Sequence, residues 1–205
     1  MSSQAHADHR AFLNRYYGVS RFIYDVTRKY YLFGRDAALR ELERDGAWRR
    51  LIEVGPGTGR NLRHLHGARP DAELGAIEAS DAMLEHARAR CPWARIEHGF
   101  AEDAPMRGLL GGLPERILFS YCLSMVGDRK AALDNARGAL AEGGEVVVVD
   151  FADFSGFPTA VGDAFRKYLR AFHVVPLDAA LLADASSLRW GPGHYYVIAR
   201  FSQKA

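Results

Sequence analysis

Apolar and polar residues follow one another in a recurring order from residue 51 onward. Short apolar runs typical of strands lie at 51–54, 73–78, 94–98, 116–123 and 145–151, and helical spacing fills 59–66, 81–90 and 128–141 between them. Asp81 and Asp128 are candidate N-caps, and Gly143 follows the third of these helices. A run as continuous as the four valines at 146–149 needs apolar cover on both faces, as in a parallel sheet. The pattern therefore predicts an α/β fold.

Both ends of the chain extend this pattern. Helical segments at 158–172 and 178–184 lead to SLRW and HYYVIARF, which are separated by GPG and predict a terminal antiparallel hairpin. Residues 22–35 also have helical spacing, with one apolar stripe that we expect to pack against the core: Phe22, Val26, Tyr30 and Phe33. We divide the chain into an N-terminal helical lid, residues 1–50, and one compact core, residues 51–205.

Composition narrows the class of protein. The 205 residues are 48% hydrophobic and 25% charged, as expected for one soluble globular core. The net charge is only +2, although residues 1–50 hold ten basic and six acidic residues, a local excess of +4. No apolar segment suits a secretory signal or a membrane span, so we expect a cytoplasmic protein. Cys91 and Cys122 are far apart and lack a CxxC pattern, which predicts two buried thiols and no metal site.

A glycine-rich turn, EVGPGTG, follows the first strand directly. Its glycines allow a tight turn and let a ligand approach the backbone at the start of a helix. The E-x-G-x-G-x-G order differs from dinucleotide and phosphate loops, and Glu53 would repel a pyrophosphate but attract an ammonium group. About twenty residues later Glu78 ends the second strand, where a carboxylate reaches ribose hydroxyls in doubly wound folds. A ligand with a ribose, a positive charge and no phosphate is S-adenosylmethionine, whose demethylated product is S-adenosylhomocysteine.

Three stretches, LIEVGPGTGRN, AIEASDAML and EHGFAEDAPM, resemble the consecutive motifs of class I S-adenosylmethionine-dependent methyltransferases. The resemblance implies a Rossmann-like, mostly parallel seven-stranded sheet. It also implies that three glycines, Gly55, Gly57 and Gly59, lie beside the amino-acid part of the cofactor and that Glu53 orients the cofactor's ammonium group. Glu78 and Ala79 would meet the ribose, and Met83 would lie near adenine. The acid that often meets the adenine amino group falls on Phe100 here, so either Glu102 replaces it or the Ala101 backbone and stacking hold adenine.

The N-terminal segment has a second helical face, formed by Tyr24, Arg28, Tyr31 and Arg35. A solvated face is one reading of its charges. Methyl transfer to an amine gives the face another use, because aromatic rings stabilise a developing alkylammonium and arginines pair with a carboxylate or phosphate. We therefore assign Tyr24 and Tyr31 to catalysis, and Arg28 and Arg35 to substrate binding.

The run IYDVTRKYYLFGRD, together with FHVVP and GPGHYYV, resembles the bacterial betaine-lipid N-methyltransferases. The resemblance implies a lipid head-group substrate, diacylglyceryl-homoserine, and three successive methyl transfers that give the trimethylated betaine lipid. The N-terminal positive charge then predicts peripheral contact with the anionic inner membrane surface.

Other candidates follow from the strand-end rule, by which ligands of this fold class lie beyond the carboxyl ends of the strands. Tyr121 and Ser124 follow the fourth strand and Asp153 the fifth, so we assign them to the substrate. His173 is a candidate proton acceptor, although a lone histidine at a helix end is commonly structural. N-methylation of a phosphatidylethanolamine-type lipid or a soluble amine stays open, as does a non-catalytic cofactor-binding subunit. The modest basic excess argues against a nucleic-acid substrate.

Overall fold

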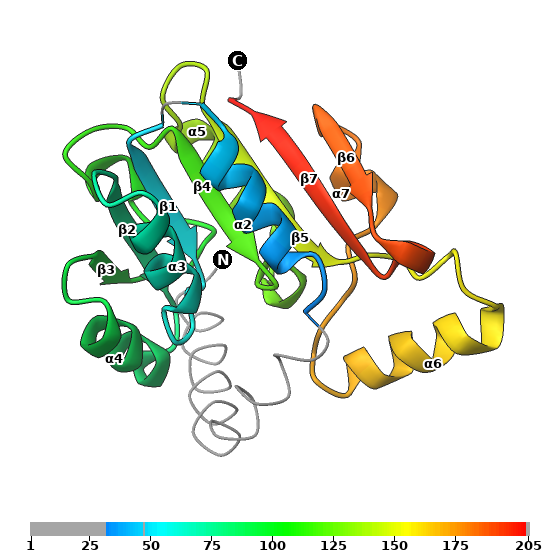
Figure 1. Ribbon diagram of the computed structural model, residues 1–205. Helices are drawn as coiled ribbons and strands as arrows, with labels where there is room; N and C mark the ends of the chain where they lie inside the picture. The colour runs from blue at the N-terminus through cyan, green and yellow to red at the C-terminus, as the bar shows by residue number, and fades with distance from the viewer. Residues whose placement is uncertain (1–31, 47, 204–205) are drawn as a thin grey trace.

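The structure is a computed structural model that describes residues 32–46 and 48–203 (Figure 1). Seven strands form one sheet in this part of the chain: β1 (Arg50–Val54), β2 (Glu73–Glu78), β3 (Arg95–His98), β4 (Arg116–Ser120), β5 (Glu145–Phe151), β6 (Ser187–Trp190) and β7 (Tyr196–Ser202). Their order is β3-β2-β1-β4-β5-β7-β6. Strands β1 to β5 are parallel, and β7 is antiparallel to both β5 and β6. The predicted Rossmann-like sheet and its C-terminal antiparallel hairpin are confirmed.

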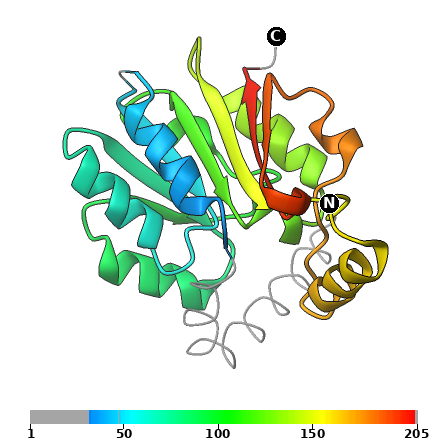
Figure 2. The same ribbon diagram turned by 45° about the vertical axis from the view of Figure 1, so that its right-hand side comes forward.

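Helices cover both faces of this sheet (Figures 1 and 2). The helices are α2 (Arg35–Arg44), α3 (Arg60–Ala68), α4 (Asp81–Arg90), α5 (Arg129–Ala139), α6 (Thr159–Arg170) and α7 (Ala179–Leu182), with short 3₁₀ turns η1 (Met106–Gly108), η2 (Leu123–Met125) and η3 (Pro192–His194). Side chains of α2, α3 and α4 share one buried cluster, and those of α5 and α7 share the other. The valines of β5 alternate between the two clusters, which explains their continuous apolar run.

Helix α2 was not predicted from the sequence. The predicted helix at 22–35 falls mostly outside the described residues, and its described end, Leu32 to Gly34, forms a turn. The helix starts at Arg35 and buries Ala38, Leu39 and Leu42 against the sheet. Residues 35–44 of the N-terminal segment thus contribute to the main hydrophobic core.

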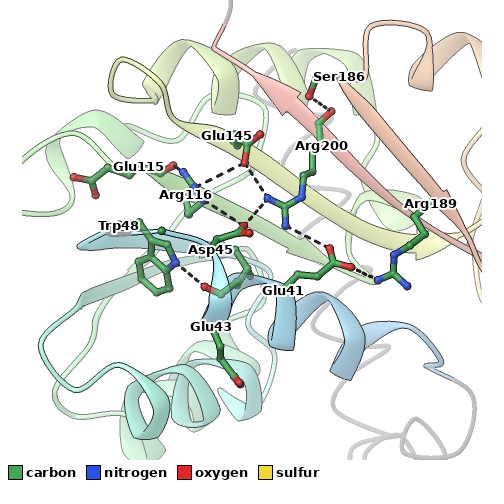
Figure 3. A network of polar contacts seen from close by, with 12 residues as sticks. Glu41, Glu43, Asp45, Trp48, Glu115, Arg116, Glu145, Ser186, Arg189 and Arg200 are labelled. Carbon is green, nitrogen blue, oxygen red and sulfur yellow. Dashed lines mark hydrogen bonds and ion pairs between the residues drawn. The ribbon is translucent and has the colours of Figure 1, made fainter.

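A network of charged side chains fixes α2 across the sheet (Figure 3). Arg200 of β7 donates to Glu145 of β5 at 2.9 Å and to Glu41 of α2 at 3.3 Å, and it also pairs with Asp45 just after α2. Arg189 of β6 pairs with Glu41 as well. Several partly buried charges with shared partners hold the helix more firmly than isolated surface pairs would.

Candidate active site

The glycine loop between β1 and α3 has the tight turn that its sequence predicts. Gly55, Gly57 and Gly59 have φ values of +65°, +55° and +74°, a region that side-chain-bearing residues rarely adopt. A Cβ on Gly55 would lie 2.5 Å from Cys122 Sγ, and one on Gly59 would lie 2.8 Å from Cys91 Sγ. A Cβ on Gly57 would meet no atom within 4 Å. Two glycines therefore allow close packing of the loop, and the middle one faces open space.

Glu53, at the end of β1, is buried directly behind this loop. Its side chain is 1% exposed, and Oε1 accepts a hydrogen bond of 2.7 Å from Asn61 Nδ2. Glu53 Oε2 and Asn61 Oδ1 have no hydrogen-bond partner in the structure. Burial raises the pKa of Glu53 to about 8, and nearby Glu78 raises it further, whereas hydrogen bonds from Asn61 and the Leu62 backbone oppose the shift. A carboxyl group that is neutral at pH 7, with one oxygen lacking a hydrogen-bond partner, thus lies beside the loop.

Glu78, at the end of β2, connects the loop to the next helix. Its Oε2 accepts from the Gly57 N–H at 3.1 Å, and its Oε1 accepts from the Ser80 N–H at 2.9 Å. Ser80 also caps α4 by accepting from the Met83 N–H, so the predicted cap at Asp81 was wrong by one residue. These contacts hold the Glu78 carboxylate at one position in the cleft.

A cleft opens along the carboxyl ends of β1, β2 and β4. Its lining consists of Val54, Gly55, Gly57, Ile77, Glu78, Ala79, Gly99, Phe100, Ala101, Glu102, Tyr121, Cys122, Met125 and Val126. Most of the predicted cofactor residues are among them. Glu53, Gly59 and Met83 are not in the lining, and the first and last of these are almost fully buried.

At the end of the cleft nearest β3, two predicted adenine contacts are close together. The Ala101 carbonyl accepts from Asn135 Nδ2 at 3.0 Å, and Glu102 Oε1 accepts from the Asp128 N–H at 3.3 Å. Both residues line the cleft beside Phe100. The structure is therefore compatible with either predicted mode of holding adenine.

The opposite end of the cleft is formed by the residues that follow β4. Tyr121 follows that strand directly, with a φ of +52°, and its hydroxyl donates to the Phe33 carbonyl. Cys122 lines the cleft next to it, so the prediction that both cysteines are buried holds only for Cys91. Cys122 directly follows Tyr121 after a parallel strand, and this position alone could have predicted that it lines the cleft.

Three other predicted substrate residues lie outside the lining. Ser124 is 2% exposed, and its N–H donates to Asp150 Oδ2 at 2.9 Å. Asp153 is exposed, with Oδ1 3.3 Å from His194 Nδ1. Burial is the largest single influence on its pKa and raises it, but hydrogen bonds with Ser155, together with the charge of His194 and a hydrogen bond with it, lower the pKa. Arg35 is mostly buried, with Nε 3.7 Å from Asp36 Oδ1. The cleft does not bring these three together.

His173, the predicted catalytic residue that the structure describes, also lies outside the lining. His173 is exposed just beyond α6, with a φ of +56°. Tyr24, Arg28 and Tyr31 lie outside the described residues, so their assignment stays a prediction. Phe33 was expected in a packed stripe, yet it is 57% exposed although its ring contacts Tyr195 at 5.5 Å.

Comparisons with known proteins agree with this geometry. A family model described as "Methyltransferase domain" matches residues 52–146. Demethylmenaquinone methyltransferase of Tropheryma whipplei (strain Twist) is 30% identical over 189 residues, covering 87% of this chain and 73% of that protein. The chain belongs to the class I S-adenosylmethionine-dependent methyltransferases.

Solved structures extend the comparison for this methyltransferase. A SAM-dependent methyltransferase from Thermotoga maritima has the same fold, with a TM-score of 0.66 and 19% identity over 94% of this chain and 100% of that one. An amino pentose methyltransferase from Micromonospora echinaspora, solved with SAM bound, is 26% identical with a TM-score of 0.50 over 62% and 55% of the two chains. S-adenosylmethionine is therefore the cofactor of this methyltransferase.

The cleft of the methyltransferase fits this cofactor. Open space at Gly57 allows a ligand to approach the backbone, and the Glu53 carboxyl behind the loop would ionise when an ammonium group lies near it. Glu78 and Ala79 would hold the ribose, and the Phe100 to Glu102 segment would hold adenine. When bound, the cofactor supplies an electrophilic methyl group on a sulfonium, and the chain's task is to align an acceptor with it and exclude water.

Proposed function

We propose that this methyltransferase is an N-methyltransferase of a membrane lipid. Its acceptor would be the amino group of diacylglyceryl-homoserine, which three successive methylations convert to the trimethylated betaine lipid. The observation that supports this most is the hydrogen bond from the Tyr121 hydroxyl to the Phe33 carbonyl. It attaches the described end of the run IYDVTRKYYLFGRD, the run that resembles the betaine-lipid enzymes, to a residue that lines the cleft.

Aromatic rings near this contact suit a cationic product. Tyr121 lies edge-on to Phe151 with ring centroids 4.8 Å apart, and Phe151 contacts Tyr195 at 5.7 Å. Of these three rings, that of Tyr121 lines the cleft, and an aromatic face there would attract an alkylammonium group as its positive charge develops. Tyr24 and Tyr31 would add to this environment under the proposal.

The carboxylates of the described cleft lining also favour an amine. They are Glu78 and Glu102, and each accepts backbone hydrogen bonds. A neutral amine has its own lone pair and needs no base to expose it, unlike a phenol or a carbon acid. Arg28 would pair with the homoserine carboxylate.

The lipid substrate implies that the enzyme works at a membrane surface. None of the helices in residues 32–46 and 48–203 is long and apolar enough to cross a bilayer. We therefore propose peripheral contact with the anionic inner membrane surface from the cytoplasmic side, favoured by the excess of +4 in residues 1–50.

Methyl-transfer assays with a labelled cofactor test the proposal. The purified protein is incubated separately with diacylglyceryl-homoserine, phosphatidylethanolamine, soluble amines and demethylmenaquinone, and lipid products are resolved by mass. We expect mono-, di- and trimethylated homoserine lipid. Transfer only to phosphatidylethanolamine or a soluble amine would reassign the acceptor, and transfer only to demethylmenaquinone would refute N-methylation.

Two substitutions on neighbouring elements separate binding from catalysis in this assay. Glu78→Gln removes the charge from the cleft, and we expect it to weaken cofactor binding at least tenfold. Glu85→Gln, on the exposed face of α4, is the matched control and should bind the cofactor normally. Tight cofactor binding by the wild-type protein with no transfer to any acceptor would favour a non-catalytic subunit.

A further inference from the structure

Helix α6 and the residues just after it expose an apolar surface. Val161, Tyr168, Phe172 and Val175 are 42%, 50%, 37% and 52% exposed, respectively. The rings of Tyr168 and Phe172 lie 4.9 Å apart. We call these four residues the α6 apolar face. Isolated exposed apolar residues are ordinary, but four of them on one helix and the residues just after it indicate an interaction surface.

Helical spacing separates this surface from the buried side of α6. Val161 and Tyr168 are seven positions apart within α6 and therefore lie on one stripe, and Phe172, just beyond the helix, contacts Tyr168. Leu169 and Gly162 are buried on an adjacent stripe, and Phe165 stacks on Phe154 there. The apolar side of α6 is thus wider than the part that packs against the rest of the protein, and its outer part remains exposed.

Positive charge borders the α6 apolar face. Lys167 and Arg170 are exposed on the same helix, and neither has an ion pair within the described part of the chain. Arg166 differs, because it pairs with Asp163 at 2.7 Å. Exposed apolar residues beside two available cations match the chemistry of an anionic bilayer surface, where apolar groups enter the interface and cations meet lipid phosphates.

The surface lies at the same edge of the sheet as the cleft. Helix α6 follows the carboxyl end of β5 and lies beyond that edge in Figure 1. The Val175 N–H donates to the Ser124 carbonyl at 2.9 Å, and the next residue, Met125, lines the cleft. An acceptor with its head in the cleft could therefore keep its acyl chains in a bilayer that touches α6.

We propose that the α6 apolar face, with Lys167 and Arg170, docks the enzyme on an anionic lipid bilayer. The inference rests on the proposed lipid acceptor for its purpose, but the docking itself is a separate physical event. Val161, Tyr168, Phe172 and Val175 enter the interfacial region, and the two cations bind lipid phosphates. The bilayer then delivers the head group to the cleft from the side of Val175.

Vesicle flotation measures this docking without any methyl transfer. The full chain is mixed at low salt with vesicles of phosphatidylcholine alone or with one third phosphatidylglycerol. We expect flotation only with the anionic vesicles, weakened by added salt because exposed charges are screened. The charge variant Lys167→Ala/Arg170→Ala should lower the partition coefficient about thirtyfold, since each cation near such a surface contributes about fivefold.

The apolar part of the proposal needs its own variant and control. Phe172→Ser/Val175→Ser should lose flotation, whereas Leu188→Ser, which changes a residue 41% exposed on the edge strand β6, should retain it. Thermal melting checks that the charge variant, the apolar variant and the Leu188→Ser control all fold. Unchanged flotation of the folded charge variant and the folded apolar variant would overturn the docking assignment, as would a concentration-dependent dimer that only Phe172→Ser/Val175→Ser dissociates.

Activity assays distinguish a failure of docking from a failure of the proposed function. With the acceptor dispersed in detergent, the charge variant should methylate as fast as the wild-type protein, and with the acceptor in anionic vesicles it should be slower at least tenfold. Equal loss in both formats would contradict docking while leaving the acceptor intact. Flotation that depends on α6 without transfer to the homoserine lipid would preserve docking and refute the acceptor.

Discussion

Glu53→Gln tests the electrostatics of the site most directly. Burial raises the pKa of this carboxyl from its ordinary value of 4.5 to about 8. Between these values the unfolded chain has lost the proton while the folded chain keeps it, so folding becomes less favourable as pH rises. Across this pH interval the contribution of Glu53 to the free energy of unfolding changes by roughly 5 kcal/mol, at about 1.4 kcal/mol per pH unit. Roughly 3 kcal/mol of this change falls between pH 6 and pH 8.

The assay is urea denaturation of the ligand-free protein at pH 6, 7, 8 and 9. Other titrating groups affect both proteins alike, so the difference in unfolding free energy between Glu53→Gln and wild type isolates this carboxyl. We expect the variant to gain roughly 3 kcal/mol relative to wild type from pH 6 to pH 9, because glutamine keeps the Asn61 contact and cannot ionise. A constant difference across this range would refute the buried neutral acid.

Cofactor binding provides a second readout of the same group. An ammonium placed near Glu53 favours its ionised form, so binding at pH 7 should release a proton from the wild-type protein. Calorimetry with S-adenosylhomocysteine in two buffers of different ionisation enthalpy measures that proton. Glu53→Gln should release none, and equal proton release by both proteins would show that the ligand ammonium does not act on Glu53.

Three further substitutions test the loop, the network and the anchor of the N-terminal run. Gly55→Ala forces a Cβ to 2.5 Å from a thiol at a φ of +65°, so cofactor affinity measured by calorimetry should fall at least tenfold, whereas Gly67→Ala, in open space on α3, should not change it. Arg200→Met leaves three carboxylates without their shared partner and should cost about 2 kcal/mol in urea denaturation, whereas Lys130→Met, in an exposed pair, should leave the unfolding free energy nearly unchanged. Gly34→Ala would push a Cβ to 2.4 Å from the Tyr196 ring and displace Phe33, so methyl transfer should fall while calorimetric cofactor affinity is kept.

The sheet and most helices could be predicted because their signals are local. The β5 valines indicate a strand buried on both faces, and Asp128 caps α5 as the sequence suggested. Helix α2 was missed because the apolar residues of the aromatic run before it have a clearer helical spacing than those of α2. Its own apolar residues, Ala38, Leu39 and Leu42, are few among charged neighbours. Partners distant in the sequence, above all Arg200, decide where the helix lies.

The site was predicted unevenly for a similar physical reason. The roles of the glycine loop and of Glu78 depend on backbone conformation and on spacing along the chain, and both can be read from a sequence. The strand-end rule names an edge of the sheet but not the direction of a side chain. Tyr121 therefore lines the cleft while Ser124, three residues later, is buried within η2. Cys122 reaches the cleft because Gly55 leaves room for it, and that contact joins two loops that are far apart in the sequence.

The core also decides how the N-terminal run meets the cleft. Arg200 and Arg189 fix Glu41 of α2, so the start of that helix has little freedom to shift over the sheet. The Gly34 turn fits against the Tyr196 ring, and the Phe33 carbonyl accepts from Tyr121. The end of the distinctive run is therefore fixed by core packing rather than by a substrate. A fixed point of attachment beside the cleft favours a selective methyltransferase over a promiscuous one.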